Sequence, residues 1–171
     1  MREIGFRPLE RDDLGLMHEW LQREHVRRWW DEHESYGDVA RHYLPAIEGR
    51  RPVELYLILL DDRPIGFIQS YVLSDFPEFA ARVGVGEGVA GVDLFLAETG
   101  LTGKGLGTEV LRRFVSDVVF ANPDVTACIA EPDVRNAASI RAFEKAGFRR
   151  VGEFLEPGDG QLHALVRVER V

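Results

Sequence analysis

The spacing of apolar residues changes several times along the first half of the chain. Alternation at residues 4–8 predicts a short first strand, and helical spacing predicts a helix after Asp12 or Asp13 and a second over about 37–48. Strand patterns follow at 53–60, 65–73 and 89–97, the first two joined by the turn Asp61–Pro64. The stretch 75–88, with Pro77 and three glycines, is expected to be an irregular surface loop.

The second half of the chain is predicted to form a helix, a strand, a second helix and then a hairpin of two strands. Leu106, Val110, Leu111, Phe114, Val118 and Val119 form one apolar stripe of an amphipathic helix. A strand at 125–131 follows, and Asn136 can cap a helix that runs to Lys145, with Gly147 where a left-handed cap belongs. Strands at 148–155 and 162–168 complete the order βααβββαβαββ, which predicts a mixed α/β fold in one domain over residues 1–171.

Composition narrows the class of protein. The 171 residues are 45% hydrophobic and 29% charged, which is typical of a globular chain and excludes a disordered one. The formal net charge of −8 argues against a nucleic-acid partner, because neutralising phosphates needs clustered Lys and Arg. An acidic balance suits a cationic small molecule, although solubility alone also explains it.

The cysteine count and the lengths of the hydrophobic runs indicate the cellular compartment of the protein. Cys128 is the single cysteine, which excludes an intrachain disulfide and favours a reducing, cytoplasmic location. The charged N-terminus does not resemble a signal peptide, and the apolar run 55–60 is too short to span a membrane. No histidine has a metal-binding spacing with Cys128, and His163 is expected to be a surface residue.

A glycine-rich loop, Gly103-Lys104-Gly105-Leu106-Gly107, precedes the amphipathic helix. Its glycines allow a ligand close to the backbone, and the helix N-terminus offers free N–H donors to an anion. The spacing fits neither a Walker A loop nor the dinucleotide fingerprint. Two readings stay open, a pyrophosphate cradle and a helix entry that binds nothing.

The loop, the element order and the segment 136–148, which ends in Glu-Lys-Ala-Gly-Phe, together resemble the GNAT superfamily of acyl-CoA-dependent N-acetyltransferases. That resemblance implies the GNAT fold, an α+β arrangement with a mixed central sheet and helices on both faces. His18-Glu-Trp-Leu, Val26-Arg-Arg-Trp-Trp, Gln69-Ser-Tyr and Gly91-Val-Asp, in this order, are similar to aminoglycoside 6′-N-acetyltransferases. Acyltransferases that act on hydroxylated lysine share the same stretches.

The resemblance implies acetyl-CoA as co-substrate and assigns residues to it. The pyrophosphate would lie on the loop, and a backbone N–H near Phe95 or Leu96 would face the thioester oxygen. The implied cofactor-binding set is Phe95, Leu96, Gly103, Lys104, Gly105, Leu106, Gly107, Thr108, Asn136, Ser139 and Lys145.

Asp93 is the candidate catalytic residue. It interrupts an apolar strand, where a carboxylate is costly unless it is paired or hydrated. An ion pair or a backbone hydrogen bond is one explanation, whereas the resemblance implies a general base that binds the 6′-amine. An alkylammonium must lose a proton before it attacks the thioester, and a nearby carboxylate can accept that proton.

The acid that many family members carry is missing. Where a tyrosine can protonate the departing thiolate, this chain has Phe143, which has no proton to give and suits core packing. Ser139, one turn earlier, is a candidate substitute.

Further candidates line the acceptor side. Gln69 and Tyr71 share one strand face, which predicts either a cleft lining or a solvated sheet face. Trp29 and Trp30 precede the acidic run 31–34. Either one ring covers a substrate ring while the carboxylates hold its amines, or one ring packs in the core and the acidic run is a solvated loop. Glu131 and Asp133 end a strand, and the resemblance makes Glu131 a second ammonium ligand.

The resemblance, together with the acidic candidates, implies an acetyl-CoA-dependent N-acetyltransferase that acts on the 6′-amine of aminoglycoside antibiotics, as in antibiotic resistance. It would need no metal, nucleic acid or membrane, and both monomer and homodimer are consistent with the sequence. The alternatives are a small-amine or hydroxylysine N-acyltransferase and a non-catalytic acyl-CoA-binding sensor.

Overall fold

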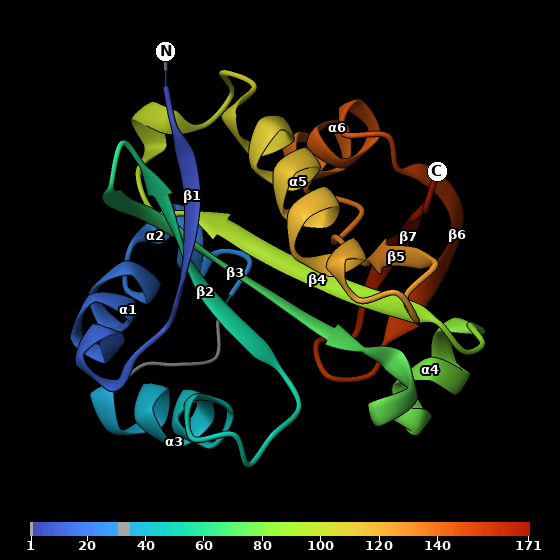
Figure 1. The fold of residues 1–171 in the computed structure, drawn as a ribbon, viewed down its shortest axis with the longest axis horizontal. Helices are drawn as coiled ribbons and strands as arrows, with labels where there is room; N and C mark the ends of the chain where they lie inside the picture. Colours follow the sequence, from blue (N-terminus) through green and yellow to red (C-terminus); the bar gives the residue numbers. More distant parts are fainter. Residues whose placement is uncertain (1, 31–34) are drawn as a thin grey trace. The chain divides into compact units, whose positions relative to one another are not determined.

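The computed structural model describes residues 2–30 and 35–171. Its strands form one mixed sheet in the order β1-β2-β3-β4-β5-β7-β6 (Figure 1). The strands are β1 (Ile4–Pro8), β2 (Glu54–Leu60), β3 (Arg63–Val72), β4 (Val89–Leu96), β5 (Ala127–Ala130), β6 (Arg149–Glu156) and β7 (Gln161–Glu169). The α-helices are α1 (Leu14–Leu21), α2 (Glu24–Arg27), α3 (Tyr36–Ile47), α4 (Pro77–Val83), α5 (Leu106–Asp117) and α6 (Ala137–Lys145).

The predicted strands and the four predicted helices are confirmed within a few residues, but the prediction of an irregular loop over 75–88 is wrong. That stretch contains α4, which starts at Pro77, ends at Val83 and is capped by Gly84 with a φ of 71°. Proline suits the first turn of a helix, and glycine suits the left-handed cap after it. The same two residues that suggested a loop are therefore the start and stop signals of a short helix.

By their contacts, the residues group into two compact units, which we describe separately. The first consists of Met1–Gln69 and Leu94–Thr102, and the second of Ser70–Asp93 and Gly103–Val171. The chain passes from one to the other within β3 and β4, so neither unit is one continuous segment. The single domain expected over residues 1–171 stays a prediction.

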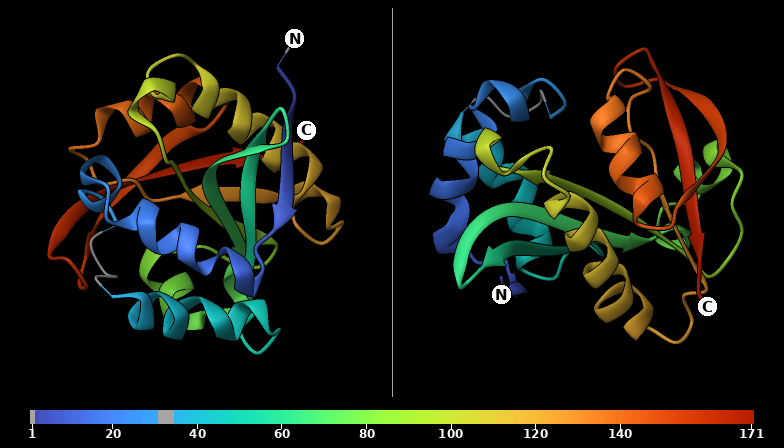
Figure 2. Two further views of the ribbon diagram at one scale, coloured as in Figure 1. Left: turned by 90° about the vertical axis from the view of Figure 1, so that its left-hand side faces the viewer. Right: turned by 90° about the horizontal axis from the view of Figure 1, so that it is seen from above.

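The first unit is built around aromatic side chains. Trp30 meets the rings of Phe67 and Phe95 edge-on, with centroids 5.9 and 5.2 Å apart, and Tyr43 contacts Phe67 at 5.5 Å. Each such pair contributes about 0.5–1.5 kcal/mol beyond the burial of its surface. Helices α1 and α3 lie side by side in this unit (Figure 2).

The second unit is organised by β5, whose four residues are all buried. It pairs in parallel with β4 and antiparallel with β7, which also pairs with β6. Buried positions of β4 and β5 form a hydrophobic core with Leu73. Helices α5 and α6 lie side by side (Figure 1), and the Thr108 hydroxyl lies 3.5 Å from the Ala142 carbonyl oxygen, to which it donates.

In the described ranges, none of the helices has both the length and the apolar character that crossing a membrane requires.

Candidate functional site

Two carboxyl groups lie where β4 and β5 stop pairing. The last parallel pair is Gly91 with Ile129, and two residues further along each strand are Asp93 and Glu131. Because side chains alternate with a period of two, both carboxyl groups point to the face that Gly91 and Ile129 share. The register therefore brings together two acidic residues that are 38 positions apart in the sequence.

Glu131 is largely withdrawn from solvent. Its Oε1 accepts a hydrogen bond from the Tyr71 hydroxyl at 3.3 Å. Its Oε2 has no accessible surface and no hydrogen-bond partner among residues 2–30 and 35–171. A buried carboxylate oxygen with no donor costs free energy, and a cationic ligand group can supply the missing donors.

Burial and charge change the acidity of this cluster. Burial raises the pKa of Glu131 well above its usual value, and the neighbouring Asp93 charge raises it further, while the Tyr71 hydrogen bond opposes both. Burial also raises the pKa of Tyr71, again helped by Asp93 and Glu131. Tyr71 is thus a neutral donor, and Glu131 holds a proton more firmly than an ordinary glutamate does.

Gly91 makes room for the Tyr71 ring, a role that the sequence analysis missed. A Cβ atom on Gly91 would lie 2.5 Å from Cζ and 2.7 Å from both Cε2 and the hydroxyl oxygen of Tyr71. The ring therefore crosses the β4 backbone at Gly91 and reaches Glu131 beyond it. The signal in the sequence was the glycine two positions before Asp93, on the same strand face.

Cys128, in β5, is fully buried, and burial together with the Glu131 and Asp93 charges raises the pKa of its thiol far above the usual range. We expect it not to react with 5,5′-dithiobis(2-nitrobenzoate) in the native protein at pH 7.5, because the thiolate is the nucleophile. Absorbance at 412 nm should report no free thiol over an hour and one thiol per chain after addition of guanidinium. Rapid labelling of the native protein would contradict this placement.

The glycine loop has the backbone that a ligand cradle needs. Gly103 and Gly105 have φ of 72° and 79°, in the left-handed region, and α5 starts immediately afterwards at Leu106. Residues 103–105 are exposed, and the first N–H groups of the helix that follows have no partner within the helix. Thr108 differs from expectation in one respect, because its hydroxyl contacts α6 and the residue is only 7% exposed.

Helix α6 begins and ends as predicted. The Asn136 side chain caps it by accepting a hydrogen bond from the Ser139 N–H at 3.2 Å. Phe143 is buried and meets Phe148 edge-on at 5.0 Å, so it packs in the core. Lys145 is exposed at the last turn, where its carbonyl accepts from the Arg112 side chain.

The first unit holds the remaining candidates. Trp30 packs in the aromatic cluster, whereas Trp29 lies under the Arg28 guanidinium at 5.0 Å. Phe95 is buried, and Leu96 and Gln69 are half-buried. The acidic residues 31–34 lie outside the described residues.

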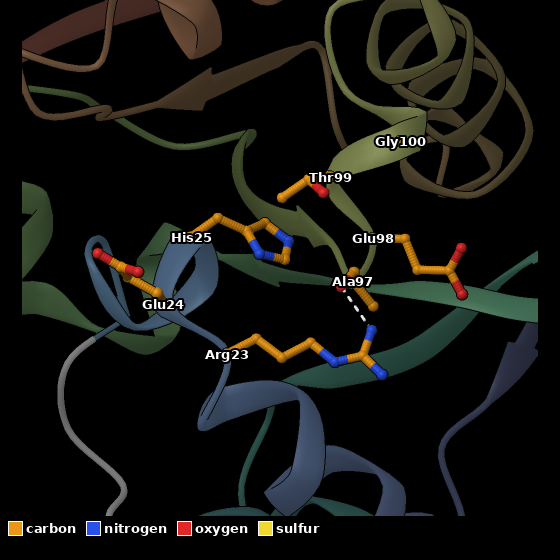
Figure 3. A pocket seen from close by; sticks show the side chains of 7 residues that line it. All are labelled: Arg23, Glu24, His25, Ala97, Glu98, Thr99 and Gly100. Atoms are coloured by element: carbon orange, nitrogen blue, oxygen red, sulfur yellow. Dashed lines mark hydrogen bonds between the residues drawn. The ribbon is translucent and has the colours of Figure 1, made fainter.

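An open depression of about 470 Å³ lies at the end of β4 in this unit. Arg23 donates to the Ala97 carbonyl at 2.7 Å (Figure 3). The His25 ring nitrogen Nε2 lies 3.0 Å from the Leu96 carbonyl oxygen. These side chains bind the carbonyl of the last residue of β4 and the carbonyl of the residue after it. The lining residues, which the sequence analysis did not single out, are Arg23, Glu24, His25, Ala97, Glu98, Thr99 and Gly100.

Two further polar residues, Asp133 and His163, lie near the end of β5. Asp133 accepts from Arg135 at 3.0 and 2.7 Å, which lowers its pKa and balances its charge. The expectation that His163 is a surface residue is wrong, because only 14% of its side chain is exposed. Its ring nitrogens lie 2.7 Å from the Glu131 carbonyl oxygen and 2.8 Å from Asp159 Oδ2.

Comparison with known proteins agrees with this architecture. Residues 10–155 match the family model of the acetyltransferase (GNAT) domain. An aminoglycoside N(6′)-acetyltransferase type 1 of Klebsiella pneumoniae is 35% identical over 170 residues, which cover 98% of this chain and 84% of the relative. A lysine N-acyltransferase of Mycolicibacterium paratuberculosis is 26% identical over 150 residues, covering 82% of this chain and 63% of that protein.

Among solved structures, aminoglycoside acetyltransferase AAC(6′)-Ib in complex with coenzyme A and kanamycin superimposes with a TM-score of 0.82. It is 32% identical, and the match covers 98% of this chain and 95% of the other. The sequence match over most of the chain and the shared fold lead to one conclusion: this chain belongs to the GNAT-domain acetyltransferase family.

Proposed function

We propose that the protein transfers acetyl from acetyl-CoA to the 6′-amino group of an aminoglycoside. The observation that carries this proposal is the pair of neighbouring carboxyl groups, Asp93 and Glu131. The buried Oε2 of Glu131 has no donor within the described ranges 2–30 and 35–171. Such a pair favours a cation over a neutral ligand, because an ammonium supplies both charge and N–H donors. Relatives named as aminoglycoside 6′-acetyltransferases support the choice of acceptor.

In the proposed reaction the carboxyl pair binds the ammonium group of the acceptor. Asp93 then accepts a proton, directly or through water, and leaves a neutral amine that attacks the thioester carbon. The tetrahedral intermediate gives up the second amine proton to water and expels the CoA thiolate, which leaves a neutral amide. The reaction therefore needs no covalent enzyme intermediate. Holding amine and thioester together supplies much of the acceleration.

The glycine loop is proposed to hold the pyrophosphate of acetyl-CoA. The backbone N–H groups of residues 103–107 would donate hydrogen bonds to the phosphate oxygens. The positive end of the α5 dipole and the exposed Lys104 side chain would add electrostatic attraction. Phe95, Leu96, Asn136, Ser139 and Lys145 stay predicted contacts of the same co-substrate. Since Phe143 is core, the thiolate would take its proton from water or from Ser139.

The acceptor side is proposed to use Tyr71 as well, through its contact with Glu131. Trp29, Trp30 and Gln69 stay predicted acceptor contacts. Asp133 is a weaker candidate than Glu131, because Arg135 already balances its charge. The cytoplasmic location stays a prediction from the single cysteine.

Release of CoA tests the reaction. Purified protein with acetyl-CoA should release CoA when kanamycin is added and should not do so without an acceptor. Release that no amine stimulates would contradict the proposal and favour the acyl-CoA-binding sensor.

The similarity to a lysine N-acyltransferase favours a second candidate, transfer of an acyl group to a lysine-type amine. The same assay with Nε-hydroxylysine and a long-chain acyl-CoA distinguishes the two. A higher kcat/KM for that pair than for kanamycin and acetyl-CoA would favour the second candidate.

Acceptor binding is expected to release a proton from Glu131. The pKa of Glu131 is raised in the free folded protein, so the folded state binds this proton more tightly than the unfolded state does. The resulting contribution to folding stability is fully present below about pH 4.5 and is lost as the pH rises through the folded-state pKa. A bound ammonium lowers that pKa. Calorimetry of kanamycin binding at pH 6, in buffers of different ionisation enthalpy, should show up to one proton released.

The Glu131→Gln variant is the control, because it keeps the size of the side chain and cannot titrate. It should release fewer protons than the wild type under identical conditions. Equal proton counts in the two proteins would place the titrating group elsewhere.

A further inference from the structure

His163 lies in β7 beside the residues that follow β5. It forms an isolated antiparallel bridge with Asp133, flanked by hydrogen bonds from the Ala164 N–H to the Pro132 carbonyl (2.8 Å) and from the Val134 N–H to the Leu162 carbonyl (3.1 Å). Asp133 and His163 are therefore a non-hydrogen-bonded antiparallel pair, and the side chains of such a pair lie close together on one face of the sheet. Glu131, two residues before Asp133, faces the same way.

The imidazole of His163 has an acceptor at each nitrogen. Nδ1 lies 2.7 Å from the Glu131 carbonyl oxygen, which can only accept, and therefore Nδ1 must carry a hydrogen. Nε2 lies 2.8 Å from the Asp159 carboxylate, which when ionised also only accepts. Both contacts are satisfied together only by the doubly protonated, cationic ring. The Phe154 ring of β6 stacks on it at 5.8 Å and limits its rotation.

The charged surroundings favour that cation. Asp159 contacts it from the turn between β6 and β7, and Asp133 faces it from beyond β5, with Arg135 bound to Asp133. Burial lowers the pKa of His163, but the bonds to Glu131 and Asp159 and both carboxylates outweigh it, so the pKa is raised. Asp133, Asp159 and His163 also present three possible metal-ligand atoms within 4.8 Å of one another, but the bonds described here already occupy those atoms.

We propose that His163 is a positioning residue that holds the end of β5 through the Glu131 carbonyl and so fixes the Glu131 carboxyl group toward the acceptor amine. This inference rests on the proposed function, in which Glu131 binds that amine. Asp159, in the turn between β6 and β7, would then contribute to acceptor binding indirectly, through its bond to His163.

The test replaces His163 with Phe, which keeps the stack on Phe154 but removes both donors, and Asp159 with Asn, which removes only the charge. Carboxyl ¹³C and imidazole ¹⁵N titrations follow Glu131 and His163 in the free proteins. We expect a His163 pKa above 6.5 in the wild type and a lower one in Asp159→Asn. In His163→Phe the pKa of Glu131 should fall toward its usual value, because the carboxyl group is no longer held in its buried position.

Kinetics provide the second readout. At pH 6 the KM for kanamycin should rise roughly tenfold in His163→Phe, the effect of one weakened hydrogen bond to a charged group, while kcat and the KM for acetyl-CoA stay within about twofold. The neutral ring can keep its hydrogen on Nδ1, so the bond to the Glu131 carbonyl survives deprotonation, whereas the bond to Asp159 and the charge on the donor are lost as the pH rises through the folded-state pKa of His163. The ratio of variant to wild-type KM should therefore fall at alkaline pH but stay above one. Leu162→Ala, on the opposite face of the same strand, is the control and should change neither readout.

Three results would overturn the inference: a wild-type His163 pKa of 6.5 or lower, a Glu131 titration that His163→Phe leaves unchanged, or a KM for kanamycin at pH 6 that His163→Phe leaves unchanged. Stabilisation of the wild type by Zn²⁺, lost in His163→Phe, would instead assign the cluster to a metal. If kanamycin is not acetylated at all, the proposed function fails, and the two titrations still decide whether His163 positions Glu131.

Discussion

Asp93→Asn is expected to lower kcat/KM for kanamycin by about 10²–10⁴-fold, the usual effect of losing a general base. Asparagine has nearly the same shape but accepts no proton at neutral pH, so the ammonium form of the acceptor persists. The loss should be largest near pH 6 and smaller at alkaline pH, where more of the amine is already neutral. Initial rates of CoA release between pH 6 and 9 measure both effects.

The matched control for this variant is Asp117→Asn. Asp117 is an exposed residue at the end of α5, and it belongs to the same compact unit. Removing its charge changes the net charge of the protein by the same amount and should leave kcat/KM within about twofold. Full turnover by Asp93→Asn at neutral pH would show that another group, or water alone, removes the proton.

Gly91→Ala is expected to cost both stability and activity. The added Cβ would lie 2.5 Å from Tyr71 Cζ, a distance that folded proteins do not tolerate, so the ring or the strand must move. Overpacking of this kind costs about 1–3 kcal/mol. Moving the ring also breaks its hydrogen bond to Glu131 and should raise the KM for kanamycin. Urea unfolding and steady-state kinetics of the same preparation measure the two effects.

Gly152→Ala separates this effect from the general effect of removing a strand glycine. Gly152 lies in β6, and a Cβ there would have no neighbour within 4 Å. Alanine at this position should be neutral or slightly stabilising, because glycine loses more backbone entropy on folding. In a Tyr71→Ala background the added Cβ has room, so Gly91→Ala should cost little further stability there, while activity stays low. A stable, active Gly91→Ala would show that the Tyr71 ring has another position available.

Periodicity was sufficient to predict most of the fold. The stripe from Leu106 to Phe114 has a single interpretation, and the caps at Asn136 and Gly147 mark the ends of the following helix. Helix α4 could not be recognised because a helix of only seven residues offers too little periodicity to outweigh Pro77 and the glycines after it.

The site was predictable only in part, because its residues come together through strand pairing that local sequence patterns do not reveal. Alternation shows which face Asp93 occupies on its own strand, but the pairing of Gly91 with Ile129 decides that Glu131 is its neighbour. The crossing of Tyr71 over Gly91 likewise depends on strand order. His163 was misplaced because both of its acceptors, the Glu131 carbonyl and Asp159, come from segments whose positions no local pattern reveals.

Transfer to a 6′-amine held by the carboxyl pair is the central claim, and a pair of acceptors that differ only at that position tests it most directly. CoA release is measured with acetyl-CoA and an aminoglycoside that carries a 6′-amino group, and then with its 6′-hydroxyl counterpart, which has the same remaining amines. The account predicts turnover with the first and none above background with the second. Equal turnover with both would place the acetyl group on another amine and contradict the account.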